Sequence, residues 1–256
     1  MSYQGGKVKL GSKIHHVISL IENFFEDDKL EYFEPFVGFC GVMRHFAKEK
    51  DRTCFGCDLN TDIVLMWQKL QKGWNPPINC NKDEYLKLKK SKTHSAKRGF
   101  LGVACSYGGI FFVGYRSNQR LGSRNRKSVN LTRDSILKTA DDVKNVKFFE
   151  SKSYDKFKPK NQLIYADPPY AENKYTQSEF FKFDSDHFWD VMRKWSKNNI
   201  VVISERNAPP DFKKIWSTEL GVNHNSKQSK HNECLYMHDI LYQELDSKIK
   251  KELKNI

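Results

Sequence analysis

The sequence predicts an α/β protein with a doubly wound, mostly parallel sheet and an inserted subdomain. Residues 30–71 alternate between strand-like and helix-like stretches, which is the pattern of parallel strands joined by helices. Strand-like apolar runs return at residues 146–150, 162–166 and 200–204. From residue 73 on, the alternation gives way to a basic segment, which indicates an insertion between the two regions.

The first helix is predicted from about Ser12 to Glu26. Four apolar residues recur at helical spacing and therefore share one face: Ile14, Val17, Ile18 and Ile21. Ser12 is a suitable N-cap because its hydroxyl can accept a hydrogen bond from the first turn.

The alternating region follows this helix. Its predicted elements are a strand over Leu30 to Phe36, a tight turn over Val37 to Gly41, a helix over Val42 to Lys48, a strand over Thr53 to Cys57, and a helix over Asn60 to Gln71. Asp58 comes directly after the second of these strands. Ligands of open α/β sheets bind beyond the carboxyl ends of the strands, so an acid at this place is a candidate binding residue.

The basic segment begins at the loop Gly73-Trp74-Asn75-Pro76-Pro77. Residues 82–133 carry 13 Lys and Arg against two acids, Asp83 and Glu84. The aromatic, glycine-rich stretch from Ser106 to Tyr115 within it predicts a hairpin or an ordered loop. The predicted domains are a main domain, residues 1–72 and 134–256, and an insertion, residues 73–133.

The remaining predicted elements follow the basic segment and include both strands and helices. They are strands over Val146 to Glu150, Gln162 to Ala166 and Ile200 to Ser204, a helix over Asp184 to Lys197 with Phe188, Val191, Met192 and Trp195 on one face, late strands within 214–243, and a charged terminal helix over Glu244 to Lys254.

The composition excludes several classes of protein. Lys and Arg number 44 against 31 Asp and Glu, a formal net charge of +13. This charge predicts a polyanionic partner, most simply nucleic acid. A mean hydropathy of −0.72 predicts no membrane-spanning helix, and the polar N-terminus is not that of a secretory signal. Hydrophobic residues at 38% are too frequent for a disordered chain.

The six cysteines do not form the pattern of a disulfide scaffold. Cys54 and Cys57 are spaced like half of a zinc site, but no second pair follows. We interpret them as buried thiols of a strand in a protein of the reducing, intracellular environment. No cluster of metal-ligating residues is apparent, so no metal is predicted.

Asp167-Pro168-Pro169-Tyr170 is the strongest motif, and it follows the apolar run Leu163-Ile164-Tyr165-Ala166. The two prolines prevent the strand from continuing, so the acid is held at the sheet edge beside an aromatic ring. Such a site offers acceptors for an exocyclic amino group and a ring on which a base can stack. The other Pro-Pro pairs, at 76–77 and 209–210, lack this combination of acid, aromatic residue and preceding strand.

Two weaker motifs accompany it. Glu34-Pro35-Phe36-Val37-Gly38 leads into a glycine turn, and Asp58 lies 20 residues after Gly38, a spacing suited to a ribose-binding acid. Tyr3-Gln4-Gly5-Gly6-Lys7 stands at the N-terminus.

In this order and combination the motifs resemble those of the Dam-like DNA adenine-N6 methyltransferases, which have a Rossmann-like fold and use S-adenosylmethionine. The resemblance spans about residues 3–204. It implies that the cofactor is bound by Tyr3, Lys7, Phe36, Gly38, Asp58, Tyr154 and Asp167. It further implies that Asp58 binds the ribose, and that Asp167, Pro168 and Tyr170 receive the target adenine. Cys40 departs from the family pattern, which has a small residue, often Gly, at this place.

The resemblance also implies that the partner is double-stranded DNA and that the insertion recognises the target. The side chains that suit this task are Arg116, Asn118, Gln119, Arg120, Arg124 and Arg126, because Arg reads guanine and Asn or Gln reads adenine in the major groove. The target amino group is hidden in the duplex, so the base must be rotated out of the stack.

Three alternatives remain open at this point. The same scaffold serves methylation of cytosine N4, methylation of adenine in RNA, and catalytically silent DNA binding. The first two often have Ser or Asn before Pro-Pro, so Asp167 favours adenine. Restriction–modification, repair marking and viral self-protection would all share these motifs, which also leave the recognition sequence and oligomeric state open.

Overall fold

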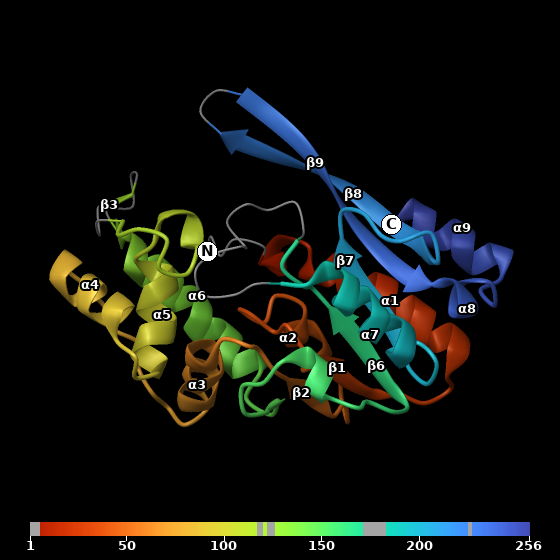
Figure 1. Ribbon diagram of the computed structural model, residues 1–256, viewed down its shortest axis with the longest axis horizontal. Coiled ribbons are helices and arrows are strands. Elements are labelled where there is room, and N and C mark those ends of the chain that lie inside the picture. The colour runs from red at the N-terminus through yellow and green to blue at the C-terminus, as the bar shows by residue number, and fades with distance from the viewer. Residues whose placement is uncertain (1–5, 117–119, 122–125, 171–182, 225–226) are drawn as a thin grey trace. The chain divides into compact units, whose positions relative to one another are not determined.

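The computed structural model describes residues 6–116, 120–121, 126–170, 183–224 and 227–256 (Figure 1). The chain divides into two compact units. Unit 1 comprises residues 1–11 and 37–154, and unit 2 comprises residues 12–36 and 155–256.

Unit 2 is built on a mixed sheet with the strand order β1-β6-β7-β9-β8. The strands are β1 (Glu31–Glu34), β6 (Gln162–Ala166), β7 (Ile200–Glu205), β8 (Phe212–His224) and β9 (Lys227–His238). β6 runs parallel to both β1 and β7, with Tyr32 beside Leu163 and Ile164 beside Val201. β9 is antiparallel to β7 and to β8.

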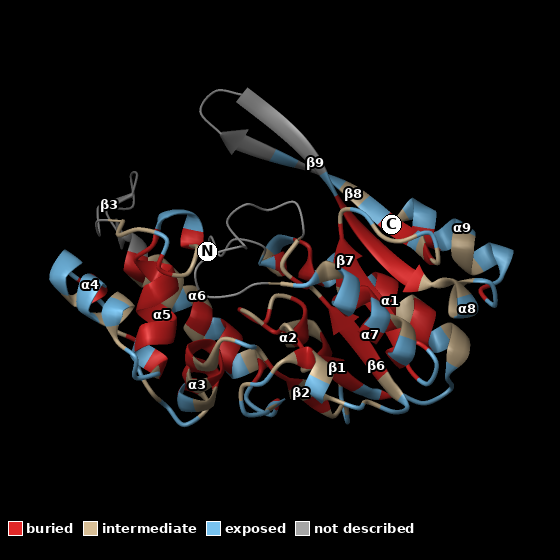
Figure 2. Ribbon diagram, viewed as in Figure 1, coloured by how far each residue is buried: buried red, intermediate tan, exposed pale blue. Residues whose placement is uncertain are grey.

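The central strands of this sheet are the core of unit 2. All six residues of β7 are buried, as are the last four of β6, which explains the apolar runs Ile200 to Ile203 and Leu163 to Ala166 (Figure 2). The helices are α1 (Gly11–Phe25), α7 (Ser185–Trp195), α8 (Asp239–Tyr242) and α9 (Ser247–Asn255). The predicted apolar faces of α1 and α7 are confirmed, because Ile14 and Ile18 on α1 and Met192 on α7 are fully buried.

Unit 1 contains a parallel pair of short strands, β2 (Cys54–Gly56) and β5 (Lys147–Phe148). Its α-helices are α2 (Met43–Phe46), α3 (Thr61–Leu70), α4 (Lys82–Lys90), α5 (Ala96–Ala104) and α6 (Ser128–Asp142). Asn60 caps α3, since its side chain accepts a hydrogen bond from the N–H of Asp62 at 3.1 Å. A two-stranded ribbon of β3 (Arg120–Leu121) and β4 (Arg126–Lys127) also belongs to unit 1.

The basic segment is more helical than its sequence suggested. α4 and α5 were not predicted, and α6 crosses the predicted end of the insertion at residue 133. The ordered loop predicted over Ser106 to Tyr115 is confirmed, because its two end residues form an antiparallel bridge and Tyr107 N–H donates to the carbonyl of Gly114 at 3.1 Å.

The fold class is confirmed as α/β with mostly parallel strands. Two details of the prediction were wrong. α1 begins at Gly11, so Ser12 lies inside the helix and is not its N-cap. Residues 239–242 form α8, although they fall in the region predicted as late strands. The side chain of His238 caps this helix by accepting a hydrogen bond from Ile240 N–H.

All six cysteines are buried and free of disulfide bonds, as the sequence indicated. Among the described residues, no helix is both long and apolar enough to cross a membrane. The described part of the chain also holds no group of three or more His, Cys, Asp or Glu side chains suited to a metal ion.

Candidate active site

The turn after β1 has the backbone conformation that its glycine predicts. Gly38 has a φ of 44° and Cys40 a φ of 55°, both in the left-handed region that glycine adopts most easily. Cys40 therefore takes the conformation that a Gly would take at the place where the sequence departs from the family pattern. The turn is tied to the end of β2, because Val37 N–H donates to the carbonyl of Cys57 at 2.8 Å.

Asp58 is the acid that holds this turn. Its Oδ2 accepts a hydrogen bond from Gly38 N–H at 3.0 Å, and its Oδ1 accepts one from Asn60 N–H at 2.9 Å. Burial raises the pKa of Asp58 above its ordinary value, against the lowering effect of these two N–H groups. A carboxylate has about four lone-pair positions, so acceptor positions remain for a ligand that donates hydrogen bonds.

Lys7 lies against the same turn. It opens the short 3₁₀ helix η1 (Lys7–Lys9) and is 6% exposed. A Cβ placed on Gly41 would lie 3.0 Å from the backbone nitrogens of Lys7 and Val8, so the absence of a side chain at Gly41 allows this close approach. Lys7, the last residue of the N-terminal motif, and the glycine turn are therefore neighbours within unit 1.

Tyr154 comes from a distant part of the sequence, at the end of unit 1. It is buried and begins the 3₁₀ helix η4 (Tyr154–Lys156). The residues just before it are tied to the end of β2, because Ser151 Oγ donates to the carbonyl of Leu59 at 2.8 Å and the Cys57 thiol contacts the carbonyl of Glu150 at 3.5 Å. Unit 1 thus contains four of the predicted cofactor residues: Lys7, Gly38, Asp58 and Tyr154.

The Asp-Pro-Pro-Tyr motif belongs to unit 2 and follows β6 directly, as predicted. The hydroxyl of Tyr170 donates a hydrogen bond to Glu233 Oε1 at 2.5 Å and lies 3.2 Å from Ser204 Oγ. The guanidinium carbon of Arg206 lies 5.9 Å from the centroid of the Tyr170 ring.

The surroundings of this motif concentrate carboxyl groups. Burial and the negative charges of Asp167 and Glu233 raise the pKa values of both Tyr165 and Tyr170 well above the ordinary value. Both phenols are therefore neutral at physiological pH. A site of carboxylates and neutral hydroxyls suits a ligand that donates hydrogen bonds, such as an amine.

The sequence did not indicate Ser204, Arg206 or Glu233 as residues of this site. Ser204 and Glu205 end an otherwise apolar strand, and Glu233 precedes the buried run Cys234 to Met237. Only Ser204 had an available signal, as a polar residue near the end of a buried strand, whereas Glu233 lies within β9 and had none.

Other predicted site residues are distributed differently. Phe36 falls in unit 2, where its ring packs against Phe183 and Phe188 at centroid distances of 6.2 and 5.9 Å. In the insertion, Arg116 N–H donates to the carbonyl of Cys105 at 2.7 Å, and Arg120 and Arg126 belong to β3 and β4. The predicted residues that lie outside the described part of the chain are Tyr3, Asn118, Gln119 and Arg124.

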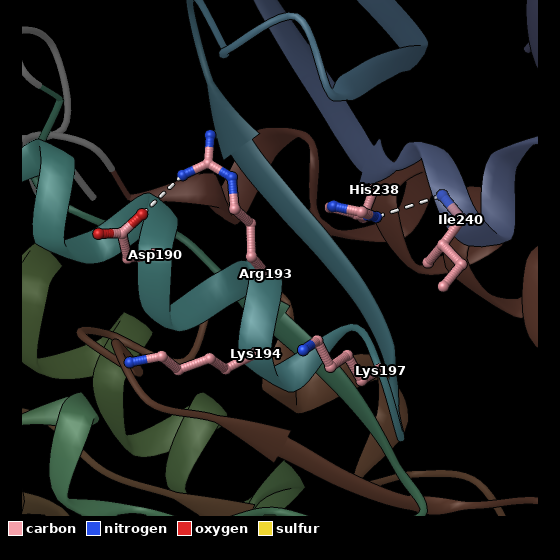
Figure 3. A pocket seen from close by; sticks show the side chains of 6 residues that line it. All are labelled: Asp190, Arg193, Lys194, Lys197, His238 and Ile240. Atoms are coloured by element: carbon pink, nitrogen blue, oxygen red, sulfur yellow. Dashed lines mark hydrogen bonds and ion pairs between the residues drawn. The ribbon is translucent and has the colours of Figure 1, made fainter.

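A cavity of about 370 Å³ in unit 2 is separate from these residues. It is lined by Asp190, Arg193, Lys194, Lys197, His238 and Ile240 (Figure 3). The guanidinium of Arg193 is already hydrogen-bonded to Asp190 and to both carboxylate oxygens of Asp211. The cavity contains none of the predicted site residues.

A mostly parallel α/β sheet, a glycine turn paired with an acid after the next strand, and Asp-Pro-Pro-Tyr after a further strand are the features that the sequence predicted for a cofactor-dependent methyltransferase. The chain belongs to the D12 class N6 adenine-specific DNA methyltransferase family, whose model matches residues 3–232. It is thus an adenine-specific DNA methyltransferase, and its methyl donor is S-adenosylmethionine.

Several solved structures resemble the chain at low identity. A proposed RNA methyltransferase from Pyrococcus horikoshii has a TM-score of 0.42 and 8% identity, covering 88% of this chain and 83% of that one. TrmN from Thermus thermophilus has a TM-score of 0.37 and 11% identity, and the match covers 93% of this chain and 53% of TrmN. Magnesium protoporphyrin IX methyltransferase from Synechocystis has a TM-score of 0.35 and 6% identity, and the match covers 89% of this chain and 79% of that one. No curated protein matched the sequence.

Proposed function

We propose that the chain transfers a methyl group from S-adenosylmethionine to N6 of an adenine rotated out of duplex DNA, at a specific sequence. The observation that carries the proposal is the position of Asp167-Pro168-Pro169-Tyr170 at the carboxyl end of the buried parallel strand β6. Ligands of α/β sheets bind at such strand ends. Membership of the adenine-specific family supports adenine over cytosine.

The residues of unit 1 fit the donor. Asp58 is held by two backbone N–H groups and keeps acceptor positions for the two ribose hydroxyls. Lys7 and the left-handed turn at Gly38 and Cys40 would contact the rest of the molecule, and Tyr154 would lie near its adenine. When bound, S-adenosylmethionine supplies a methyl group that is activated by the positive charge of its sulfonium sulfur.

The residues of unit 2 would act on the target base. The amino group of adenine is a poor nucleophile because its lone pair is delocalised into the ring. Asp167 and the carbonyl of Pro168 would accept hydrogen bonds from its two N–H groups and so localise that lone pair. Tyr170 would stack on the base, which offsets part of the few kcal/mol that unstacking costs. In the proposed reaction, these residues contribute mainly by aligning the adenine amino group with the methyl group of the donor.

The proposal is tested by incubating plasmid DNA with the enzyme and methyl-labelled donor, followed by digestion to nucleosides. We expect the label in N6-methyladenine at a defined sequence. Label in N4-methylcytosine would support the alternative target base, and preferential labelling of an RNA copy would support an RNA substrate. Donor and DNA binding without transfer would identify a silent DNA-binding protein.

Replacing Asp58 with Ala is expected to weaken donor binding by roughly 1–3 kcal/mol, because ribose hydroxyls would lose a buried acceptor. Isothermal titration calorimetry measures the dissociation constant. Asp141→Ala, an exposed acid on α6 of the same unit, is the control and should leave it unchanged. An unchanged dissociation constant for a folded Asp58→Ala protein would remove Asp58 from the donor site.

We propose further that the basic insertion, residues 73–133, contacts the DNA. Replacing Arg116, Arg120, Arg124 and Arg126 with Ala should weaken DNA binding and reduce its salt dependence, because fewer phosphates would be neutralised. Fluorescence anisotropy at several salt concentrations gives both quantities. The control replaces four lysines of α9, which is the same change of charge in unit 2: Lys248, Lys250, Lys251 and Lys254. Equal salt slopes in all three proteins would contradict the assignment.

A further inference from the structure

The hydroxyl of Tyr170 is held by two side chains from neighbouring strands of unit 2. Glu233 on β9 accepts the hydrogen bond from Tyr170 at 2.5 Å, and its Oε1 also accepts one from Ser204 Oγ on β7 at 2.5 Å. Ser204 Oγ lies 3.2 Å from the Tyr170 oxygen, so the three oxygens form a closed triangle. β7 and β9 are adjacent strands, with Ser204 beside Leu235 in the register.

This triangle is buried. Ser204 is 0% exposed and Glu233 is 4% exposed, although both are polar. The phenol of Tyr170 retains its proton, because burial and the nearby carboxylates raise its pKa. It therefore donates to Glu233. Hydrogen bonds to a carboxylate in such surroundings are strong and directional.

A third contact acts on the ring itself. Arg206 follows β7, and its guanidinium carbon lies 5.9 Å from the ring centroid of Tyr170, within the range of a cation–π contact. The side chain of Tyr170 is thus fixed at its hydroxyl by Glu233 and Ser204 and contacted on its ring by Arg206. Asp167 and Tyr170 belong to one tetrapeptide, so this anchor acts on the segment that the proposed reaction uses.

We propose that Glu233 is a positioning residue of the methyl transfer reaction, which sets the ring of Tyr170 through the Tyr170 hydroxyl. This inference rests on the proposed function, in which that ring stacks on the target adenine. A tyrosine side chain without an anchor can rotate about two torsions. Misplacement of a positioning group by about 1 Å can cost on the order of 100-fold in rate. A ring held in place before the base arrives avoids this loss.

The first experiment compares two substitutions of Tyr170 in single-turnover methylation at saturating donor and DNA. Tyr170→Phe keeps the ring and removes the anchored hydroxyl, and we expect it to slow the reaction roughly 10–100-fold. Tyr170→Ala removes the ring as well and should be slower still. If Tyr170→Ala is impaired and Tyr170→Phe is not, the positioning role of Glu233 is overturned and stacking remains. If both react at the wild-type rate, the proposed role of Tyr170 itself fails.

The second experiment substitutes Glu233. Glu233→Leu should slow the reaction about as much as Tyr170→Phe, and Glu233→Gln, whose amide oxygen can still accept from the hydroxyl, should restore much of the lost rate. The double variant Tyr170→Phe/Glu233→Leu should be no slower than either single variant, because both remove the same contact. Glu252→Leu, an exposed acid on α9, is the matched control.

Two outcomes would overturn the inference even with folded proteins. One is an additive loss in the double variant, which would mean that Glu233 acts on the structure and not through the Tyr170 hydroxyl. The other is a Glu233→Gln protein as slow as Glu233→Leu. If Glu233→Leu does not fold, the comparison of Tyr170→Phe with Tyr170→Ala still decides, because Tyr170→Phe leaves every strand residue in place.

Discussion

Replacing Asp167 with Ala is expected to abolish methyl transfer while the protein stays folded and still binds DNA. Asp167 follows β6 and is the acid of the Asp-Pro-Pro-Tyr motif. In the proposed reaction its carboxylate accepts a hydrogen bond from the adenine amino group and localises the lone pair. Its loss should therefore act on the chemical step. Single-turnover methylation at saturating donor and DNA measures this step apart from binding.

The DNA affinity of the Asp167→Ala protein should be equal or slightly higher, because a negative charge is removed near an anionic partner. Donor binding should weaken if the carboxylate also contacts the amino-acid end of the donor, as the family resemblance implies. Asp190→Ala, at an exposed position on α7 of the same unit, should react at the wild-type rate. A folded Asp167→Ala protein that methylates adenine at nearly the wild-type rate would disprove the assignment of residues 167–170 as the catalytic segment.

The parallel strands and the turn could be predicted because their signals are local. The apolar runs at 162–166 and 200–204 are buried on both sides, so they read as continuous hydrophobic stretches. The position of Asp58 just beyond β2 could be predicted, because the strand-like run ends at Cys57. Its hydrogen bond from Gly38 N–H was not predicted, because the sequence assigned this carboxylate only to a ribose.

Glu233 could not be predicted, because its partner lies 63 residues earlier in the chain. Its hydrogen bond from Ser204 depends on the register of the antiparallel strands β7 and β9, and the apolar pattern does not fix that register. A buried acid in a strand looks in the sequence like an ordinary exposed residue. The network around Tyr170 is therefore visible only once the strands are paired.

The helices of the basic segment were missed for a different reason. Four of the nine residues of α4 are lysines, and α5 contains two glycines, which have low helix propensity. Contacts with α3, rather than helix propensity, stabilise α5. Asp62, at the start of α3, accepts hydrogen bonds from the guanidinium of Arg98 and from Ser95 N–H, so an ion pair joins α5 to α3.

Replacing Arg98 with Met is expected to lower the free energy of unfolding by about 3–5 kcal/mol, the usual result of removing one partner of a buried ion pair. Arg98 is 6% exposed and Asp62 is 0% exposed, so the buried carboxylate would keep only Ser95 N–H and the exposed imidazole of His94, 3.3 Å away, as partners. Arg98 also donates through Nε to the carbonyl of Leu88 at 2.9 Å and lies over the ring of Phe112 at 5.0 Å. Urea unfolding followed by circular dichroism measures the change.

The neighbouring residue provides the control. Lys97 also forms an ion pair, at 2.5 Å to Glu84, but its side chain is 48% exposed. Exposed pairs contribute about 0–1 kcal/mol, so Lys97→Met should unfold at nearly the wild-type urea concentration. Adding Asp62→Leu to Arg98→Met should recover part of the lost stability, because the unpaired buried charge disappears with it. An Arg98→Met protein as stable as Lys97→Met would mean that this ion pair does not hold α5 against α3, and that apolar contacts of Phe100 and Leu101 suffice to keep the basic segment folded.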